Sequence, residues 1–95
     1  MPQSLTVVHH QALGKFSAMI EGEEAYLLYH AGGEGVLDYV STFVPEPLRG
    51  RGIASAVVRC ALEYARQQRC RVIPSCWFVK GYVDRHPEFL DLVAN

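Results

Sequence analysis

The sequence has no long apolar segment, few cysteines and no large excess of charge of either sign. No stretch approaches the roughly 18 apolar residues that a membrane-spanning helix needs, and the N-terminus has no basic stretch followed by a long apolar run. The 3 cysteines are odd in number and show no CxxC spacing, which argues against a disulfide framework and a zinc site. From these absences we expect a cytoplasmic protein with reduced thiols, no membrane segment and no bound metal.

The charges nearly balance, with 9 bases against 10 acids and a formal net charge of −1. A basic surface that coats nucleic acid is therefore not indicated. The distribution is uneven, because residues 1–48 contain six acids and one base whereas residues 49–95 contain eight bases and four acids. The second half is thus better suited to an anionic ligand. Arg59, Arg66 and Arg69 follow helical spacing, and we expect them only to solvate a helix face.

A chain of 95 residues, 49% of them apolar, fits a single domain that spans residues 1–95, because two cores could not each bury enough surface at this length. Four early segments are β-branched or alternate apolar with polar residues, which is typical of strands, and turn signals rich in glycine separate the later ones. We therefore predict an antiparallel meander with strands at 5–8, 15–20, 25–29 and 36–44.

The pattern changes from strand to helix after Gly52. Five residues then fall on one helical face, which predicts a helix of about four turns: Ile53, Val57, Cys60, Ala61 and Tyr64. A short strand at 71–75 follows, and the helical crossover requires it to run parallel to the strand before the helix. A second helix at 78–85, ended by Pro87, precedes a tail. The predicted fold class is α/β (α+β), with antiparallel strands that lead into one βαβ unit and a short C-terminal helix.

The segment 49–54, Arg-Gly-Arg-Gly-Ile-Ala, lies between the fourth strand and the first helix. Backbone N–H groups at a helix start have no partner within the helix and point outward together, and the helix dipole favours an anion there. Gly50 and Gly52 carry no side chains that would hold a phosphate away, and Arg49 and Arg51 add cationic donors. A diphosphate is a natural ligand for this segment.

Other interpretations of the two glycines are a tight turn and a close contact between strand and helix. A dinucleotide-binding G-x-G-x-x-G motif would need glycine at Ser55, and a P-loop would need Gly-Lys-Ser/Thr, so both of these phosphate motifs are disfavoured.

Arg49-x-x-Gly52-x-Ala54 resembles the Arg/Gln-x-x-Gly-x-Gly/Ala signature of the GNAT acetyltransferase superfamily. Further segments are similar, in the same order, to the small stand-alone acetyltransferase-like proteins of about one hundred residues, and the resemblance covers nearly the whole chain. These segments are Val44-Pro45, Leu48–Ala54, Pro74–Val79 and Tyr82–Phe89. The group often has a histidine near the end of the fourth strand, where this sequence has Ser41-Thr42.

The resemblance implies a minimal GNAT fold in which acetyl-CoA lies between parallel strands that splay apart, here between 40–44 and 71–75. It implies a cofactor site of eight residues: Phe43, Val44, Arg49, Gly50, Arg51, Gly52, Ile53 and Ala54. Amides near Phe43 and Val44 would polarise the thioester carbonyl. Tyr82 would be the general acid that protonates the departing thiolate.

Cys76 follows the second parallel strand, where it is expected to line the acetyl pocket, to pack inertly, or to act as a nucleophile. No general base is assigned, since Glu46, Asp38, Glu24 and a water chain are all candidates.

The leading hypothesis is an acetyl-CoA-dependent N-acetyltransferase, whose acceptor is a primary amine of a small molecule or of a protein lysine. The alternative is a non-catalytic module that binds CoA or acyl-CoA. A nucleic-acid-binding domain is disfavoured, because the chain lacks net basic charge and interleaved aromatic residues. Neither a nucleic acid nor a membrane is an expected partner, and an oligomer is compatible with the sequence.

Overall fold

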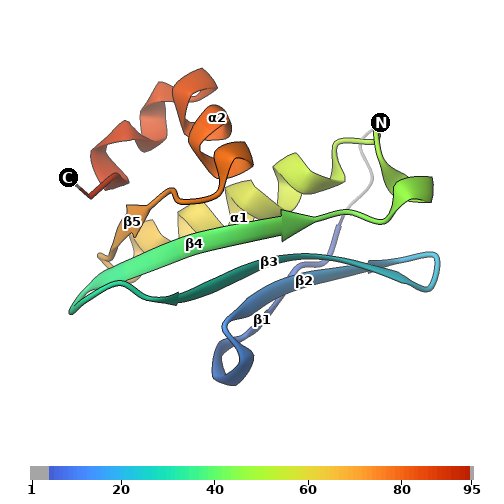
Figure 1. The fold of residues 1–95 in the computed structure, drawn as a ribbon, viewed down its shortest axis with the longest axis horizontal. Helices are drawn as coiled ribbons and strands as arrows, with labels where there is room; N and C mark the ends of the chain where they lie inside the picture. The colour runs from blue at the N-terminus through green and yellow to red at the C-terminus, as the bar shows by residue number, and fades with distance from the viewer. Residues whose placement is uncertain (1–4, 95) are drawn as a thin grey trace.

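The computed structural model describes residues 5–94, which form a mixed five-stranded sheet in the order β1-β2-β3-β4-β5. Helix α1 packs on one face of the sheet, and helix α2 with the 3-10 helix η3 lies beside α1 (Figure 1). The strands are β1 (Val8–His10), β2 (Lys15–Ile20), β3 (Glu23–Ala31), β4 (Val36–Phe43) and β5 (Arg71–Ile73). The helices are α1 (Ile53–Gln67) and α2 (Trp77–Arg85), with 3-10 turns η1 (Gln11–Leu13), η2 (Glu46–Leu48) and η3 (Pro87–Leu92).

The predicted fold class is confirmed, because β1 to β4 form an antiparallel meander and β4 pairs in parallel with β5 across the α1 crossover. The turn between β2 and β3 is made by Glu21 and Gly22, whose φ angles of 54° and 79° are both positive, as a two-residue type I′ hairpin requires. Within residues 5–94, no helix has the length and apolar character needed to cross a membrane.

The predicted first strand at 5–8 is wrong in its position, since the pairing strand is Val8–His10. The β-branched run does not determine the register here. The His9 ring stacks on Phe16 at 4.2 Å between centroids and lies edge-on to Tyr64 at 4.3 Å, so this aromatic contact holds residues 8–10 beside β2.

The C-terminal elements also differ from their predicted bounds. The strand predicted at 71–75 ends at Ile73, because Pro74 has no N–H group to continue the ladder. Helix α2 begins one residue earlier than predicted, at Trp77. The predicted tail forms η3, which buries Phe89 and Leu92 against the core.

Strands β4 and β5 separate soon after they pair. Their last paired residues are Asp38 and Ile73, after which the Cys76 N–H donates to the Tyr39 carbonyl at 2.9 Å. A β-bulge lies at the same place on the other edge of β4: Tyr39 pairs with Tyr29 and Ser41 with Leu28, so the residue between them is unpaired. Bulges bend a strand and are frequent near functional sites. Along the second half of β4, the edge that faces β5 is therefore not paired with β5.

The core lies between the sheet and α1. Phe16, Leu27 and Tyr39 are fully buried on the sheet, and the buried Tyr39 hydroxyl donates to the Ala61 carbonyl of α1 at 2.6 Å. The face predicted for α1 is largely confirmed, and its buried residues are Ile53, Val57, Val58, Ala61, Leu62 and Ala65.

The prediction that Arg59 and Arg66 only solvate a helix face is wrong. Arg59 Nη1 donates to the Tyr82 hydroxyl at 3.1 Å, and Arg66 forms two hydrogen bonds to Asp91 at 2.9 and 3.0 Å. Both arginines stand on the side of α1 against which α2 and η3 pack. Charged residues at helical spacing thus connect elements that are far apart in the sequence.

Candidate functional site

A cleft of about 600 Å³ opens where β4 has left β5. One side is formed by the end of β4 and by the loop that leads into α1, and the other by the first residues of α2. The cleft is lined by Thr42, Phe43, Val44, Leu48, Arg49, Gly50, Gly52, Ile53, Ala54, Ser55, Cys76, Trp77 and Phe78. Seven of the eight residues predicted for the cofactor site are therefore brought together here.

The two glycines of the loop adopt conformations that suit glycine. Gly50 and Gly52 have φ angles of 80° and 77°, in the left-handed region that side chains disfavour. A Cβ atom built on either would meet no atom of residues 5–94 within 4 Å, its two chain neighbours aside, so both face open space in the described part of the chain. Arg49 Nε donates to the Val44 carbonyl at 2.9 Å, which closes the loop onto the end of β4. The backbone is consequently exposed to anything that enters the cleft at this end.

The start of α1 presents free backbone donors. Gly52 is the N-cap, its carbonyl accepts the first helical bond from the Ala56 N–H at 3.1 Å, and it has no side chain to cap the turn. Within residues 5–94, no group accepts a hydrogen bond from the N–H groups of Ile53, Ala54 or Ser55. These donors and the positive end of the helix dipole are suited to a phosphate.

Arg51 lies apart from the other predicted cofactor residues. Its Nη2 pairs at 3.0 Å with Oε2 of Glu21, which lies in the β2–β3 turn. Of the two arginines of the loop, Arg49 lines the cleft and Arg51 does not.

Cys76 lies in the wall of the cleft, where it is 7% exposed and its sulfur is 3.5 Å from the Thr42 hydroxyl. Thr42, Trp77 and Phe78 also line the cleft and were not among the predicted site residues. The aromatic pair Trp77-Phe78 directly after Cys76 is a sequence signal that could have indicated part of this wall, and in the structure Trp77 is 82% exposed, which is typical of a binding surface.

The structure does not bring Tyr82 into the cleft. Its ring is buried, stacks on His86 at 3.9 Å between centroids, and presents its hydroxyl to Arg59. The His86 Nδ1 lies 2.9 Å from the Tyr82 carbonyl, which fixes the imidazole over the phenol ring. Tyr82 is not among the residues that line the cleft, and its role as a general acid stays a prediction.

The three carboxylates considered as a general base are also outside the cleft lining. Glu24 is held by Lys15 at 2.8 Å and by the Ser17 hydroxyl at 2.6 Å, and these hydrogen bonds lower its pKa. Asp38 has a buried oxygen without a hydrogen-bond partner. Within residues 5–94, no three His, Cys, Asp or Glu side chains are grouped as metal ligands.

Comparison with known proteins identifies the family and the fold. The model of the GCN5-related N-acetyl-transferase family matches residues 15–92. Protein NATD1 of Xenopus tropicalis is 31% identical over 86 residues, which are 88% of this chain and 79% of the relative. Protein NATD1 of Mus musculus is 32% identical over 85 residues, which are 87% of this chain and 77% of the relative. The chain therefore belongs to the GCN5-related N-acetyltransferase family.

The fold is shared with a GCN5-like protein of Staphylococcus aureus whose solution structure was determined by NMR. The two superimpose with a TM-score of 0.74 over 96% of this chain and 89% of the other, at 20% identity. At that identity the likeness concerns the fold. It supports the predicted minimal GNAT architecture.

Proposed function

We propose that the protein is an acetyl-CoA-dependent N-acetyltransferase that transfers the acetyl group to a primary amine. The observation that carries this proposal is the cleft between β4 and α2, which ends at the free N–H groups of Ile53, Ala54 and Ser55. In this proposal the diphosphate of CoA binds these donors, with Gly50 and Gly52 leaving the space that it needs. The family membership supports the same ligand.

The pantetheine arm would follow the second half of β4, where β5 has separated and leaves one edge of the strand without a partner strand. An extended arm with amide groups can use such an edge as a further strand would. Phe43 and Val44 line this part of the cleft, and their backbone is our candidate for polarising the thioester carbonyl.

The transfer itself needs few side chains. The neutral amine forms a C–N bond to the carbonyl carbon, the C–S bond breaks, the nitrogen gives up one proton and CoA leaves as a thiolate. Since a thiol has an ordinary pKa of about 8.5, its thiolate leaves readily and can take a proton from water. A general acid at Tyr82 is therefore not required by this chemistry, and it stays a prediction.

A specific observation favours the second candidate, a module that binds CoA or acyl-CoA without turning it over. Among residues 5–94, those that line the cleft include no histidine, aspartate or glutamate. A side chain that accepts the proton of the amine would have to reach the thioester from outside this lining, or water would have to take its place. If the protein is an enzyme, the bound acceptor, whether a small molecule or a protein lysine, would supply or complete the group that accepts this proton.

Two measurements on the purified protein test the proposal. Calorimetric titration with acetyl-CoA measures the binding that both candidates require, and absence of heat with acetyl-CoA and with CoA would reject both. Release of free thiol in the presence of pooled primary amines then separates them. Amine-dependent thiol release supports the enzyme, whereas tight binding without release from any amine pool supports the module.

A further inference from the structure

The first residues of α2 form one wall of the cleft, yet the sheet holds them at few points. β5 pairs with β4 over three residues only, and within residues 5–94 the backbone link from the start of α2 to β4 is the bond from Cys76 N–H to Tyr39 O. The position of this wall must therefore depend also on how α2 packs against α1.

Helices α1 and α2 both begin at the cleft, and a side-chain contact connects them one turn further along. Ser55 on α1 and Phe78 on α2 line the cleft. One turn further along each helix stand Arg59 and Tyr82, which share a hydrogen bond of 3.1 Å. Residues four apart lie on the same face of a helix. The hydrogen bond between Arg59 and Tyr82 thus connects the two helices one turn away from the residues that line the cleft.

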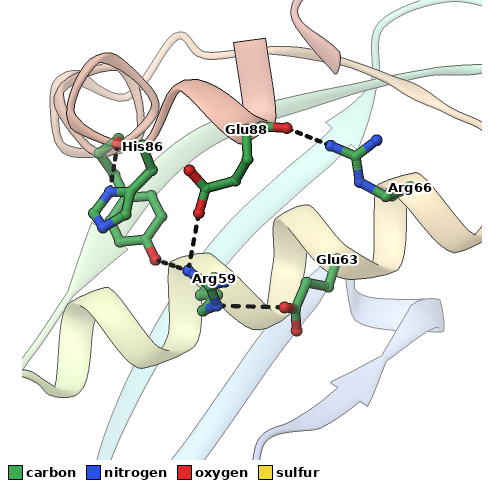
Figure 2. Close-up of polar contacts among 6 residues, drawn as sticks. Arg59, Glu63, Arg66, His86 and Glu88 are labelled. Carbon is green, nitrogen blue, oxygen red and sulfur yellow. Dashed lines mark hydrogen bonds and ion pairs between the residues drawn. The ribbon is translucent and has the colours of Figure 1, made fainter. Parts of the chain in front are cut away.

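The guanidinium of Arg59 contacts several side chains, most of them from the C-terminal segment. Besides Tyr82, it pairs with Glu63 at 3.3 Å and with Glu88 at 3.6 Å, and it lies over the Phe89 ring at 5.3 Å from the centroid. Figure 2 shows Arg59 between Glu63 of its own helix and Glu88 of η3, with His86 nearby. One side chain of α1 therefore contacts both α2 and η3.

Arg66 offers a natural comparison on the same helix. It binds Asp91 through two nitrogens, two turns further from the cleft than Arg59. It also donates to the Glu88 carbonyl at 2.6 Å (Figure 2). Both arginine side chains are 45% exposed, so their ion pairs alone stabilise the fold only weakly. What distinguishes Arg59 is its bond to the hydroxyl of Tyr82, a residue that is only 3% exposed and stands one turn from a cleft-lining residue.

From this arrangement we infer that Arg59 is a positioning residue, which holds the Trp77-Phe78 wall of α2 at a set distance from the phosphate-binding start of α1. The inference rests on the proposed function for its effect on acetyl-CoA, but the positioning itself is independent of any ligand. Arg59 does not touch the cleft, since it is not among the lining residues, and it acts through Tyr82.

The test compares Arg59→Gln with Arg66→Gln in the full chain. We expect Arg59→Gln to weaken acetyl-CoA binding about three- to tenfold by calorimetry and Arg66→Gln to change it by less than about twofold. Thermal unfolding of both variants reports the purely structural loss. If the two variants weaken binding equally, Arg59 has no special role and the inference is overturned. If Arg59→Gln does not fold, Tyr82→Phe is used instead, because it removes the same hydrogen bond and keeps the aromatic ring.

A second readout needs no ligand. The chain has a single tryptophan, Trp77, so fluorotryptophan gives one fluorine NMR resonance that reports on the wall. We expect this resonance to move or broaden in Arg59→Gln and to stay unchanged in Arg66→Gln. The same resonance in both variants would overturn the inference. If the unmodified protein binds no acetyl-CoA, the proposed function fails, but this measurement still decides whether Arg59 positions α2.

Discussion

The Thr42 hydroxyl lies 3.5 Å from the Cys76 sulfur and joins the two sides of the cleft, one on β4 and the other at the start of α2. The Cys76 backbone is bound to Tyr39 of the same strand, so the residue is attached to β4 twice. A thiol that is held in this way and 7% exposed is suited to forming the wall. The contact therefore favours a pocket-lining role for Cys76 over a nucleophilic one.

We predict that Cys76→Ala retains amine-dependent thiol release within about threefold of the original protein. The change removes only the buried sulfur atom, and the hydrogen bond from the Cys76 N–H to the Tyr39 carbonyl still holds the wall. Cys60→Ala is the matched control, since Cys60 is a half-buried thiol on α1 outside the cleft. Loss of all activity in Cys76→Ala alone, together with an acetyl group on Cys76 after incubation with acetyl-CoA, would instead establish a covalent intermediate.

The glycine at the start of α1 gives a second prediction. Gly52→Ala places a methyl group where the diphosphate is proposed to bind, and we expect acetyl-CoA binding to weaken about tenfold or more by calorimetry. The positive φ of 77° also strains the variant by about 1–2 kcal/mol.

Gly22→Ala is the control for that strain. Gly22 has a φ of 79° and, like Gly52, open space around its Cβ position, but it lies in the β2–β3 turn. We expect both variants to lose similar free energy of unfolding and only Gly52→Ala to lose affinity. Unchanged affinity in Gly52→Ala would move the phosphate site away from this loop.

Much of the fold could be predicted from the sequence because its signals are local. Alternation predicts β2, the face shared by Ile53, Val57 and Ala61 predicts α1, and the crossover rule predicts the parallel pairing of β4 with β5. The first strand could not be placed, because its position depends on contacts of the His9 ring with Phe16 on the next strand and with Tyr64, which lies far away in the chain.

The same distinction applies to the site. The loop could be proposed from the sequence because the free N–H groups of a helix start follow from its position between strand and helix. The wall formed by Trp77 and Phe78, and the side chains of Arg51, Arg59 and Tyr82, were not placed by spacing alone. Their directions are decided by partners from other elements, which one-dimensional patterns do not contain.

Tyr82→Phe separates a chemical role of this phenol from a structural one. We expect the rate of thiol release to fall less than about tenfold with an unchanged pH profile, because the hydroxyl faces Arg59 and not the cleft. A general acid normally contributes about 10²–10⁴-fold. A loss of that size, with an altered alkaline side of the pH profile, would restore Tyr82 as the acid. In the double variant with Arg59→Gln, we expect the losses in affinity not to add, since both remove the same contact.

The contacts of His9 predict how stability depends on pH. Its ring lies among Phe16, Tyr29 and Tyr64, and it hydrogen-bonds the Tyr29 hydroxyl. Burial, followed by the nearby charge of His10, lowers the pKa of His9 below its ordinary value of about 6.5. The unfolded chain therefore binds the proton more readily than the folded one.

It follows that the stability contributed by neutral His9 is fully present above about pH 6.5 and is lost as the pH falls through the folded pKa. The test variant is His9→Phe, which keeps an aromatic ring on Phe16. Its free energy of unfolding, measured with urea, is expected to decrease less between about pH 7.5 and pH 5 than that of the original protein. His30→Gln, which changes an exposed histidine, is expected to keep the full decrease. If His9→Phe loses as much stability on acidification as His30→Gln does, protonation of His9 is not what weakens the docking of β1, and the aromatic contact serves packing alone.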